Sequence, residues 1–576
     1  MFRNRKWSLG IALVVVGLLA AACAAPVSSP PAVQTVVVPQ TVVAEQTVIV
    51  PQTVIAQPTA EATPAAASET PTAGGQIVFA HSADPDTLDP HTTIAGTAWV
   101  VLANVYDGLV MLDYSSPDIP RPTIPGLAES YEVSEDGRTF TFKLREGVKF
   151  HDGSPWNAEA AVFNFRRWFD PEFEFYYPTA NSTVSSFIGG VESYEALDEY
   201  TFEVTLAESN FGWLDYLSKA PTFFMVSPAA VQQYGNEEFA LHGGGTGPFM
   251  IESYEKNNRL VLKKNPDYWG GAPNIDTLIF VPVPDDASRV AGLISGEFDI
   301  AHEISPDSIP EILANPNLHV ELRGKPATFG LGGDMREGPW SDARVREAFS
   351  LAINRQAIAE KLLRGAGEPA TQFFGLGNEG FDPTLPVMDP YDPEKAKALL
   401  QEAGYGDGFD IRMFTSTSAM GVPQPPRILE QVQRDLAEIG IRAEIVVMEW
   451  NAYLGMWVKG VPAAEGGVIP IYTQAMGWDT NQLLGAYVGS ASQPPNGVNF
   501  VWYSNPEVDK LLAESRAAKS YDAMIQKLRD AQKLMLQDRP YVYIFHSKAP
   551  YAMNNRVHWV PAAAWAQNLR KAWVSQ

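Results

Sequence analysis

The sequence is poor in cysteine and in basic residues, and both shortages narrow what the protein can be. Cys23 is the only cysteine among 576 residues, so no intramolecular disulfide can form. The 42 Lys and Arg residues are outnumbered by 67 Asp and Glu residues, and the net charge is −25. Because an acidic surface repels phosphate backbones and anionic lipid, the composition argues against nucleic-acid binding. The acidity is spread along the chain, as is typical of a soluble surface that can accept cationic ligands.

Catalytic and metal-binding patterns are also missing. The sequence contains no His-Glu-x-x-His, no Gly-x-Ser-x-Gly and no Walker lysine motif. The glycine-rich stretch 243–248 lacks a phosphate-binding lysine, so we interpret it as a turn or hinge, and we interpret His151–Ser154 as a loop. No two of the eight histidines stand at metal-ligand spacing. We therefore predict no enzyme activity, no cofactor and no resident metal, and single out only His302 for contact with a metal carried by a ligand.

Long apolar runs are confined to the N-terminus. Three basic residues precede the run Leu9–Leu19, and small residues then lead to Cys23, which is the layout of a secretory signal peptide. The position of the cysteine resembles a bacterial lipoprotein processing site, although Ala20 stands where leucine is usual. We predict a signal peptide at 1–22 and a lipid on Cys23 that anchors the protein to the cell membrane on its extracytoplasmic side. A cleaved signal with a free thiol and an uncleaved anchor are the alternatives.

Residues 23–75 are rich in Pro, Thr, Val and Gln. Gln-Thr-Val recurs four times with a period of six residues, at 34, 40, 46 and 52. The stretch has almost no charged or aromatic residues, so it cannot bury a core of its own. We predict an extended, flexible stalk; pairing of its valine-rich runs as strands with another surface is the alternative.

The remaining 500 or so residues have a globular composition, with 14 Trp, 21 Tyr and 28 Phe in the whole chain. Two hairpins are predicted in the first half, from 131–133 with 140–144 and from 249–254 with 260–263. After about residue 325, helices alternate with strands. A strand at 409–414, a helix at 427–439 and a strand at 441–448 predict a parallel βαβ unit.

Helix N-termini are marked in the second half by capping residues. Asp342 precedes an amphipathic helix, and Asp392 and Asn505 each stand before a proline at the first helical position. A further helix is predicted at 521–536 and a final strand at 541–545. Antiparallel hairpins followed by parallel α/β units indicate an α/β protein with at least two lobes, and a cleft between lobes is the natural binding site.

Short sequence blocks in a fixed order carry a resemblance to a known family. The blocks are Leu88–Pro90, Gly126–Val133, Leu144–Gly153, Gly245–Phe249, Asn265–Trp269, Asp342–Ala348, Ala352–Arg355, Tyr391–Ala396 and Ser504–Asp509. Together they resemble the family 5 extracellular solute-binding proteins, the peptide, nickel and oligosaccharide receptors of ABC importers. The resemblance covers essentially the whole globular chain.

The resemblance implies a bilobed periplasmic-binding-protein type II fold with an inserted third lobe (cluster C). We expect lobe I to comprise 76–121, 245–322 and 540–576, the insert 122–244, and lobe II 323–539. It also implies capture without chemistry by a monomer: a solute binds in the cleft, the lobes close, and the closed form docks on the transmembrane subunits of an ABC permease.

The resemblance also suggests ligand-binding residues. In peptide-binding relatives an aspartate follows a Gly-Trp segment by a few residues and pairs with the peptide α-ammonium, whereas here Asp479 follows Trp478 directly. Asp479 is either a cation anchor or the cap of a helix that starts near Thr480. Further candidates are aromatic side chains that either stack on a ligand or belong to the core, and hydrogen-bonding side chains within matching motifs. The aromatic candidates are Trp478, Phe329 and Trp502, and the polar ones are Thr246 and Asn499.

Three classes of function follow from these observations. A receptor for di- or oligopeptides is favoured, because an acidic anchor suits a peptide ammonium. An oligosaccharide receptor of the same family is the alternative, because aromatic side chains are plentiful and the Gly-Trp segment is altered. A hydrolase or a solute sensor on the same fold is a more distant third class.

Overall fold

The computed structural model describes residues 70–113, 121–416, 425–460, 466–474 and 480–575. Residues 70–576 cluster into one compact unit. The predicted signal peptide, Cys23 and most of the predicted stalk therefore lie outside the described residues. None of the helices in the described ranges is long and apolar enough to cross a membrane.

The main sheet has 11 strands and runs through the whole unit in the order β15-β14-β16-β12-β17-β11-β1-β10-β9-β8, with β13 beside β17. One part, β11-β1-β10-β9-β8, is called here the β1 part, and β16-β14-β15 the β14 part. The strands are β1 (Gln76–His81), β8 (Phe249–Glu255), β9 (Arg259–Lys264), β10 (Thr277–Pro282), β11 (Ile300–His302), β12 (Leu318–Gly333), β13 (Gly367–Pro369), β14 (Phe409–Ser416), β15 (Ile441–Met448), β16 (Gly467–Gln474) and β17 (Tyr541–Asn554).

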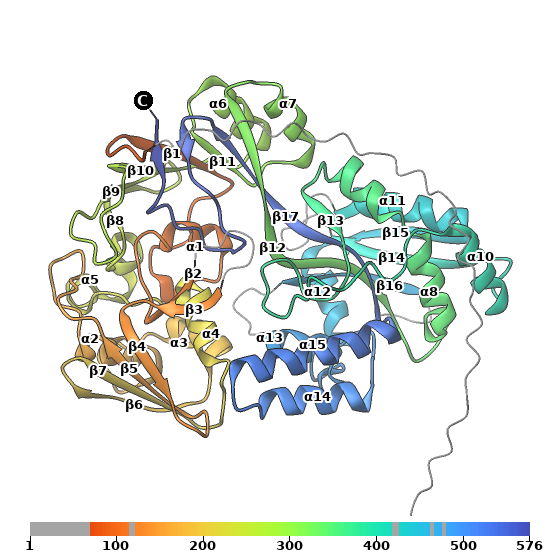
Figure 1. Ribbon diagram of the computed structural model, residues 1–576, viewed down its shortest axis with the longest axis horizontal. Coiled ribbons are helices and arrows are strands. Elements are labelled where there is room, and N and C mark those ends of the chain that lie inside the picture. The colour runs from red at the N-terminus through yellow and green to blue at the C-terminus, as the bar shows by residue number, and fades with distance from the viewer. Residues whose placement is uncertain (1–69, 114–120, 417–424, 461–465, 475–479, 576) are drawn as a thin grey trace, which may run out of the picture. The chain divides into compact units, whose positions relative to one another are not determined.

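The two parts of the main sheet are joined by β12 and β17, which lie side by side across the molecule (Figure 1). The two strands pair in two antiparallel blocks, 318–324 with 548–554 and 328–332 with 541–546, and the register shifts between Gly324 and Thr328. Residues 325–327, called here the crossing segment, thus interrupt the ladder between the blocks. The chain passes from one part of the sheet to the other through these two strands.

A second sheet, β4-β5-β7-β6, is antiparallel and contains the first predicted hairpin. Its strands are β4 (Ala128–Val133), β5 (Thr139–Leu144), β6 (Val191–Asp198) and β7 (Thr201–Leu206), and the accompanying helices are α2 (Ala158–Phe169), α3 (Pro178–Ile188), α4 (Trp213–Lys219) and α5 (Pro228–His242). Gly137 closes the β4–β5 turn with φ +68°, a conformation that favours glycine. The predicted hairpin of β8 with β9 is also present.

Helices cover both faces of the β14 part. Val542 and Ile544 of β17 contact one apolar cluster, while Tyr541 and Tyr543 contact another on the opposite face, because successive side chains of a strand alternate. The helices of this region are α8 (Ala343–Ala352), α9 (Arg355–Ala357), α10 (Pro393–Glu402), α11 (Pro425–Glu438), α12 (Trp450–Lys459), α13 (Thr480–Val488), α14 (Pro506–Arg516) and α15 (Tyr521–Asp538). The predicted caps Asp342, Asp392 and Asn505 each accept a backbone hydrogen bond at their helix N-terminus. β14 and β15 are parallel, as the βαβ prediction requires.

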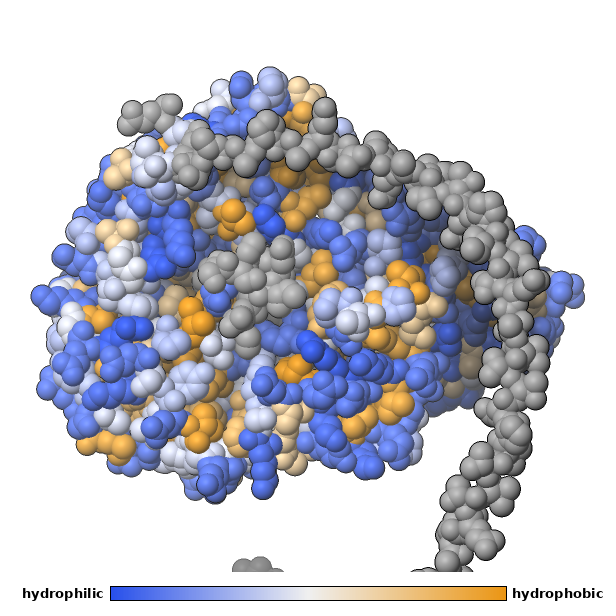
Figure 2. All heavy atoms as spheres, viewed as in Figure 1, coloured by the Kyte–Doolittle hydropathy of each residue, from blue (hydrophilic) through white to orange (hydrophobic). Residues whose placement is uncertain are grey.

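Smaller elements complete the unit. They are α1 (Gly96–Leu102), β2 (Val110–Asp113), β3 (Arg121–Pro125), α6 (Asp286–Ser295), α7 (Ile309–Leu313), β18 (Val557–His558) and β19 (Trp573–Val574). The C-terminal segment contacts the residues that follow α1: Leu569 N donates to Asn104 Oδ1, and Asn568 Nδ2 donates to Ala103 O. The face seen in Figure 2 is mostly hydrophilic, with small apolar patches between. The expected lobe boundaries remain a prediction.

A buried ion pair holds the Leu-Asp-Pro block that helped to suggest the family. Asp89 and Arg167 are both 0% exposed, and Arg167 donates to the two carboxylate oxygens over 3.2 and 2.6 Å. Arg167 also donates to Nδ1 of His91. Burial alone would raise the pKa of the Asp89 carboxyl, but the charge and hydrogen bonds of Arg167 bring this pKa below its usual value. The motif is therefore a structural link between the start of the chain and α2.

Arg167→Met should destabilise the fold by about 3–5 kcal/mol, because it leaves the Asp89 carboxylate buried without its cation. The free energy of unfolding in urea at pH 7 measures this loss. The stabilisation from Asp89 is present above the carboxyl pKa of the unfolded chain and is lost as the pH falls through the lowered pKa of the folded state. The difference in unfolding free energy between wild type and variant should therefore become smaller in acid. If the unfolding free energies of wild type and variant are equal at pH 7, or if their difference does not change in acid, the Asp89–Arg167 pair does not have this structural role.

Candidate ligand-binding site

A small cavity lies where the crossing segment, the C-terminal segment and α4 meet. It is lined by Trp99, Leu112, Lys219, Pro326, 377–379 and 563–565. Its volume is about 20 Å³, which is room for about one water molecule. In this conformation the cavity is too small for any organic solute.

Glycines bring the loop 375–380 against both neighbouring segments. A Cβ atom on Gly375 would lie 2.1 Å from the backbone nitrogen of Ala327 in the crossing segment. Gly377 has φ +82°, and a Cβ there would lie 2.5 Å from the carbonyl oxygen of Ala563. Asn378 Oδ1 accepts a hydrogen bond from Gly380 N over 2.8 Å. The loop thereby places Asn378 and Glu379 in the cavity wall.

Lys219 links α4 to this loop. Its Nζ donates to Asp215 Oδ2 and to Glu379 Oε2, both over 2.6 Å. Burial alone would lower the pKa of Lys219, but the charges of Asp215 and Glu379 raise it above its usual value. Two carboxylates share one ammonium, so the charged trio carries a net charge of about −1. A further cation would compensate that charge.

Four buried polar atoms in the cavity wall have no hydrogen-bond partner within the described part of the chain. Three are donors and one is an acceptor: Trp99 Nε1, Trp565 Nε1, Asn378 Nδ2 and Glu379 Oε1. An unsatisfied buried polar group costs about 1–3 kcal/mol, and native structures contain few of them. Their concentration around one cavity indicates a site that is completed by a ligand.

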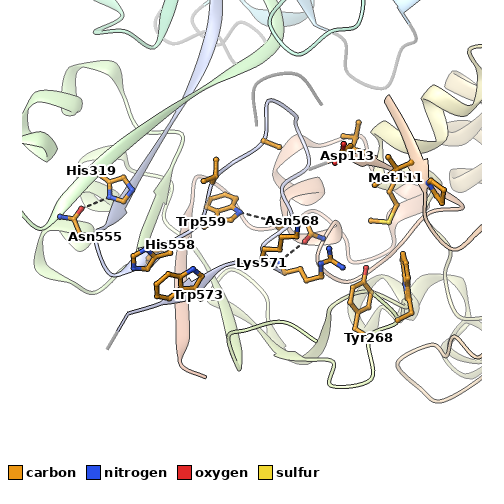
Figure 3. Close-up of a pocket in the computed structure, with 18 residues that line it drawn as sticks. Met111, Asp113, Tyr268, His319, Asn555, His558, Trp559, Asn568, Lys571 and Trp573 are labelled. Carbon is orange, nitrogen blue, oxygen red and sulfur yellow. Dashed lines mark hydrogen bonds between the residues drawn. The ribbon is translucent and has the colours of Figure 1, made fainter. Parts of the chain in front are cut away.

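A larger cavity of about 800 Å³ lies beneath the C-terminal segment and is a weaker candidate (Figure 3). Several of its polar side chains already have partners. Trp559 Nε1 donates to Asn568 O over 3.1 Å, Asn568 Nδ2 donates to Ala103 O over 2.9 Å, and His319 Nδ1 lies 2.9 Å from Asn555 Oδ1. The polar side chains of the larger cavity therefore depend less on a ligand for their hydrogen bonds. We take the small cavity as the candidate site.

Trp478 and Asp479 lie outside the described residues, so their predicted roles remain predictions. The residue that follows them, Thr480, is the first residue of α13. Its hydroxyl donates to Glu379 Oε2 over 3.2 Å. The Gly-Trp segment thus leads directly to a residue that contacts the wall of the cavity.

Thr246 has a structural partner. It is 1% exposed and its hydroxyl donates to Asp107 Oδ2 over 2.9 Å. Asp107 also accepts hydrogen bonds from Tyr268 and Trp269, each over 2.9 Å. Two of the family blocks, Gly245–Phe249 and Asn265–Trp269, therefore converge on one carboxylate, whose pKa is raised by burial despite these bonds. Thr246 does not line the candidate cavity.

Three other predicted site residues are packed within the region of the β14 part. Phe329 is buried and stacks on Phe545, with ring centroids 5.2 Å apart. Asn499 Nδ2 donates to the carbonyl oxygens of Gly489 and Tyr503. The Arg336 guanidinium lies over the ring of Trp502, with its Cζ 3.7 Å from the ring centroid. None of the three lines the candidate cavity, and their contact with a ligand remains a prediction.

His302 lies at the end of β11 in an aromatic stack. Its ring stands between His81 and Tyr551, with centroids 5.4 and 4.6 Å away, and it is 5% exposed. Burial lowers the pKa of His302 to about 3, so the ring is neutral at physiological pH. Within the described ranges no group of three or more His, Cys, Asp or Glu residues could hold a metal ion. Contact of His302 with a ligand-borne metal remains a prediction.

The fold defines the class of protein. The unit is similar to solved periplasmic binding proteins: HbpA2 from Haemophilus parasuis has a TM-score of 0.78 and 26% identity and covers 87% of this chain and 100% of its own. DppA from Helicobacter pylori in complex with the peptide STSA has a TM-score of 0.66 and 26% identity, over 88% of this chain and 99% of its own. The chain therefore has the α/β type II periplasmic-binding-protein fold.

The particular family follows from the sequence. Residues 123–507 match the model of the bacterial extracellular solute-binding proteins, family 5. The glutathione-binding protein GsiB of Escherichia coli (strain K12) is 31% identical over 479 residues, which are 82% of this chain and 88% of GsiB. GsiB of Salmonella typhi is 31% identical over 483 residues, with the same coverage. The chain belongs to the family 5 solute-binding proteins of ABC importers, which act outside the cytoplasm.

Thr246→Val should lower the free energy of unfolding by about 1–3 kcal/mol, because Asp107 loses a hydrogen bond in a buried position. Any ligand-induced rise in the melting temperature should remain unchanged, since Thr246 does not line the cavity. Thr205→Val, which removes a hydroxyl from a half-buried pair on β5 and β7, is the matched control and should cost less. Loss of the ligand-induced shift in Thr246→Val alone would make this threonine a ligand contact.

Proposed function

We propose that this protein captures a short peptide in the cavity between the crossing segment and the C-terminal segment and delivers it to an ABC permease. The observation that carries the proposal is the set of unpaired groups in the cavity wall. Three N–H donors suit the carbonyl oxygens of a peptide, and Glu379 Oε1 suits an ammonium group. The net negative charge of the Lys219 trio favours such a cation over a neutral solute.

Binding requires the walls of the cavity to separate first. β12 and β17 are the connections between the two parts of the main sheet, and their ladder is interrupted at the crossing segment. Rotation there would move the loop 375–380 away from the C-terminal segment and from Lys219 without breaking the core of either part. A peptide that contacts both walls binds the closed state better and shifts the population toward it. We propose the crossing segment as the hinge between the expected lobes.

The names of related proteins support peptide-like cargo. GsiB is a glutathione-binding protein, and the DppA structure contains the peptide STSA. An oligosaccharide remains the alternative cargo, because Trp99 and Trp565 also offer aromatic surface in the cavity wall. A neutral sugar, however, would leave Glu379 Oε1 without a cationic partner. Comparison of the affinities for peptides and for maltotriose distinguishes the two cargoes.

The enzyme hypothesis has less support. His151 Nε2 lies 3.0 Å from the carbonyl oxygen of Gly247, and Ser154 donates to Asp152 over 2.6 Å, so the three residues form loop contacts and no His–Ser relay. Relatives in the family are solute-binding proteins.

Glu379→Gln should reduce affinity for Ala-Ala-Ala by about 10- to 100-fold, because it removes the charge that faces the peptide ammonium. N-acetyl-Ala-Ala-Ala lacks that ammonium, so it should bind the wild type weakly and lose little in the variant. Isothermal titration calorimetry on both peptides gives the four dissociation constants of a double-mutant cycle.

Glu368→Gln is the matched control, since Glu368 pairs with Lys548 and does not line the cavity. It should leave both affinities unchanged. The panel also contains glutathione, Ser-Thr-Ser-Ala and maltotriose. Binding of maltotriose without binding of any peptide would overturn the peptide proposal in favour of the carbohydrate alternative, and equal effects of Glu379→Gln on both tripeptides would remove Glu379 as the ammonium anchor.

We also propose that Cys23 carries the lipid that holds the protein at the membrane. Cys23→Ser should abolish incorporation of labelled palmitate, because the thiol that accepts the lipid is removed. Ser28→Ala, a nearby substitution outside the processing site, should leave the incorporation unchanged. Wild-type protein that incorporates no palmitate would favour a free thiol or an uncleaved anchor.

A further inference from the structure

The loop that carries Asn378 and Glu379 contains turns but neither a helix nor a strand, and it is nevertheless attached to regular structure on both sides. It follows β13, which pairs with β17, and Ala370 N donates to Ile544 O over 3.1 Å. Further along, the loop is bonded to α15, the helix that leads directly into β17. The position of the loop therefore depends on α15 and β17.

One face of α15 holds the loop through three polar side chains. Arg529, Gln532 and Lys533 are spaced three and four residues apart, so they lie on the same side of the helix. Nη2 of Arg529 donates to the carbonyl oxygens of Glu379 and Phe381, over 2.8 and 2.9 Å. These bonds fix the main chain at the residue that we propose as the ammonium anchor and two residues beyond it.

Two buried glutamines form the second attachment. Gln532 accepts a hydrogen bond from Phe374 N over 3.1 Å and donates to Gln372 Oε1 over 2.8 Å. Gln372 in turn donates to Asp382 O and accepts from Asp382 N, over 2.8 and 2.9 Å. Both glutamines are 0% exposed. Lys533 Nζ lies 3.2 Å from Asp382 Oδ2, so the loop is held to α15 at its start and at its end.

The polar face of α15 is separate from the side that builds the core. The core contacts of the helix come from Met524, Leu528, Ala531 and Met535. None of the three polar side chains lines the candidate cavity. A loop that is fixed before the ligand arrives loses less conformational freedom on binding, and this preorganisation raises affinity. The hydrogen bonds of the polar face can therefore act on binding through the geometry of the loop.

We propose that Arg529, Gln532 and Lys533 are positioning residues of the site, which hold Asn378 and Glu379 in the orientation that the ligand requires without touching the ligand. This inference rests on the proposed peptide-binding function and adds the part of the fold that sets its affinity. Because α15 continues into β17, the loop moves together with that strand. The anchor thus keeps its geometry while the walls of the cavity separate and close.

The test compares Ala-Ala-Ala with N-acetyl-Ala-Ala-Ala by isothermal titration calorimetry on the full chain. The ratio of the two affinities measures how well Glu379 meets the ammonium group, and a merely structural role would not change it. Arg529→Met should lower this ratio about 10-fold, because the loop loses two hydrogen bonds at and beside Glu379. Arg529→Lys keeps the charge and should recover part of the ratio. In Arg529→Met/Glu379→Gln the ratio should equal that of Glu379→Gln alone.

Two further variants separate positioning from general destabilisation. The side chain of Lys533 is 44% exposed, so Lys533→Met leaves the core intact, and it should lower the ratio about two- to fivefold. Asn164→Leu is the matched control, since this 0% exposed amide donates to Ala160 O and Val226 O, away from the cavity. It should lower the free energy of unfolding and leave the ratio unchanged.

The outcomes distinguish this inference from the function on which it rests. A wild-type ratio retained in both Arg529→Met and Lys533→Met would overturn the positioning role while peptide binding stands, and so would an equal loss of the ratio in Asn164→Leu. Equal binding of both tripeptides by wild type would remove the anchor that this face is proposed to hold, and would overturn the inference while peptide capture stands. Failure of both tripeptides to bind wild type would overturn the proposed function and this inference together.

Discussion

The arrangement of the site depends on one structural constraint, which is that the two parts of the main sheet share the strands β12 and β17. Continuous main-chain hydrogen bonding along these strands would make a rigid sheet, but the register shift between Gly324 and Thr328 breaks the ladder at the crossing segment. A second register shift lies between Phe329 and Gly330. The structure therefore combines two well-packed parts with an irregular ladder between them. The candidate cavity lies beside the crossing segment, so a ligand there contacts residues carried by both parts.

The acidic side of the cavity wall has more carboxylates than cations. Lys219 is shared by Asp215 and Glu379, each at 2.6 Å. The second carboxylate oxygen of Glu379 is buried and has no hydrogen-bond partner among the described residues. A buried carboxylate is stabilised by a cationic partner, so a ligand that carries an ammonium group would favour the closed state.

Much of the fold could be predicted from the sequence, because local signals decide it. Asp342, Asp392 and Asn505 mark helix starts, period-two alternation marks β4 and β5, and all appear where expected. The site was harder to predict, because its members come from α1, α4, a loop after β13 and the C-terminal segment, and no sequence pattern connects them. Matching motifs and aromatic character suggest Thr246 and Phe329 as ligand contacts; in the structure they contact Asp107 and Phe545, and their role toward a ligand remains a prediction.

Two signals in the sequence could have pointed toward the cavity. Asp215 and Lys219 are spaced four residues apart on α4, and the loop Gly375–Gly380 has three glycines in six residues, as a tight loop between packed segments does. Neither signal indicates that the helix and the loop meet, because that contact depends on a chain that crosses between the sheet parts twice. Hydrogen bonding is the better guide once the fold is known: four buried polar atoms of the residues that line one small cavity have no partner among the described residues. Their cost is recovered only when a ligand forms the missing bonds, and this difference in free energy is what makes closure depend on the ligand.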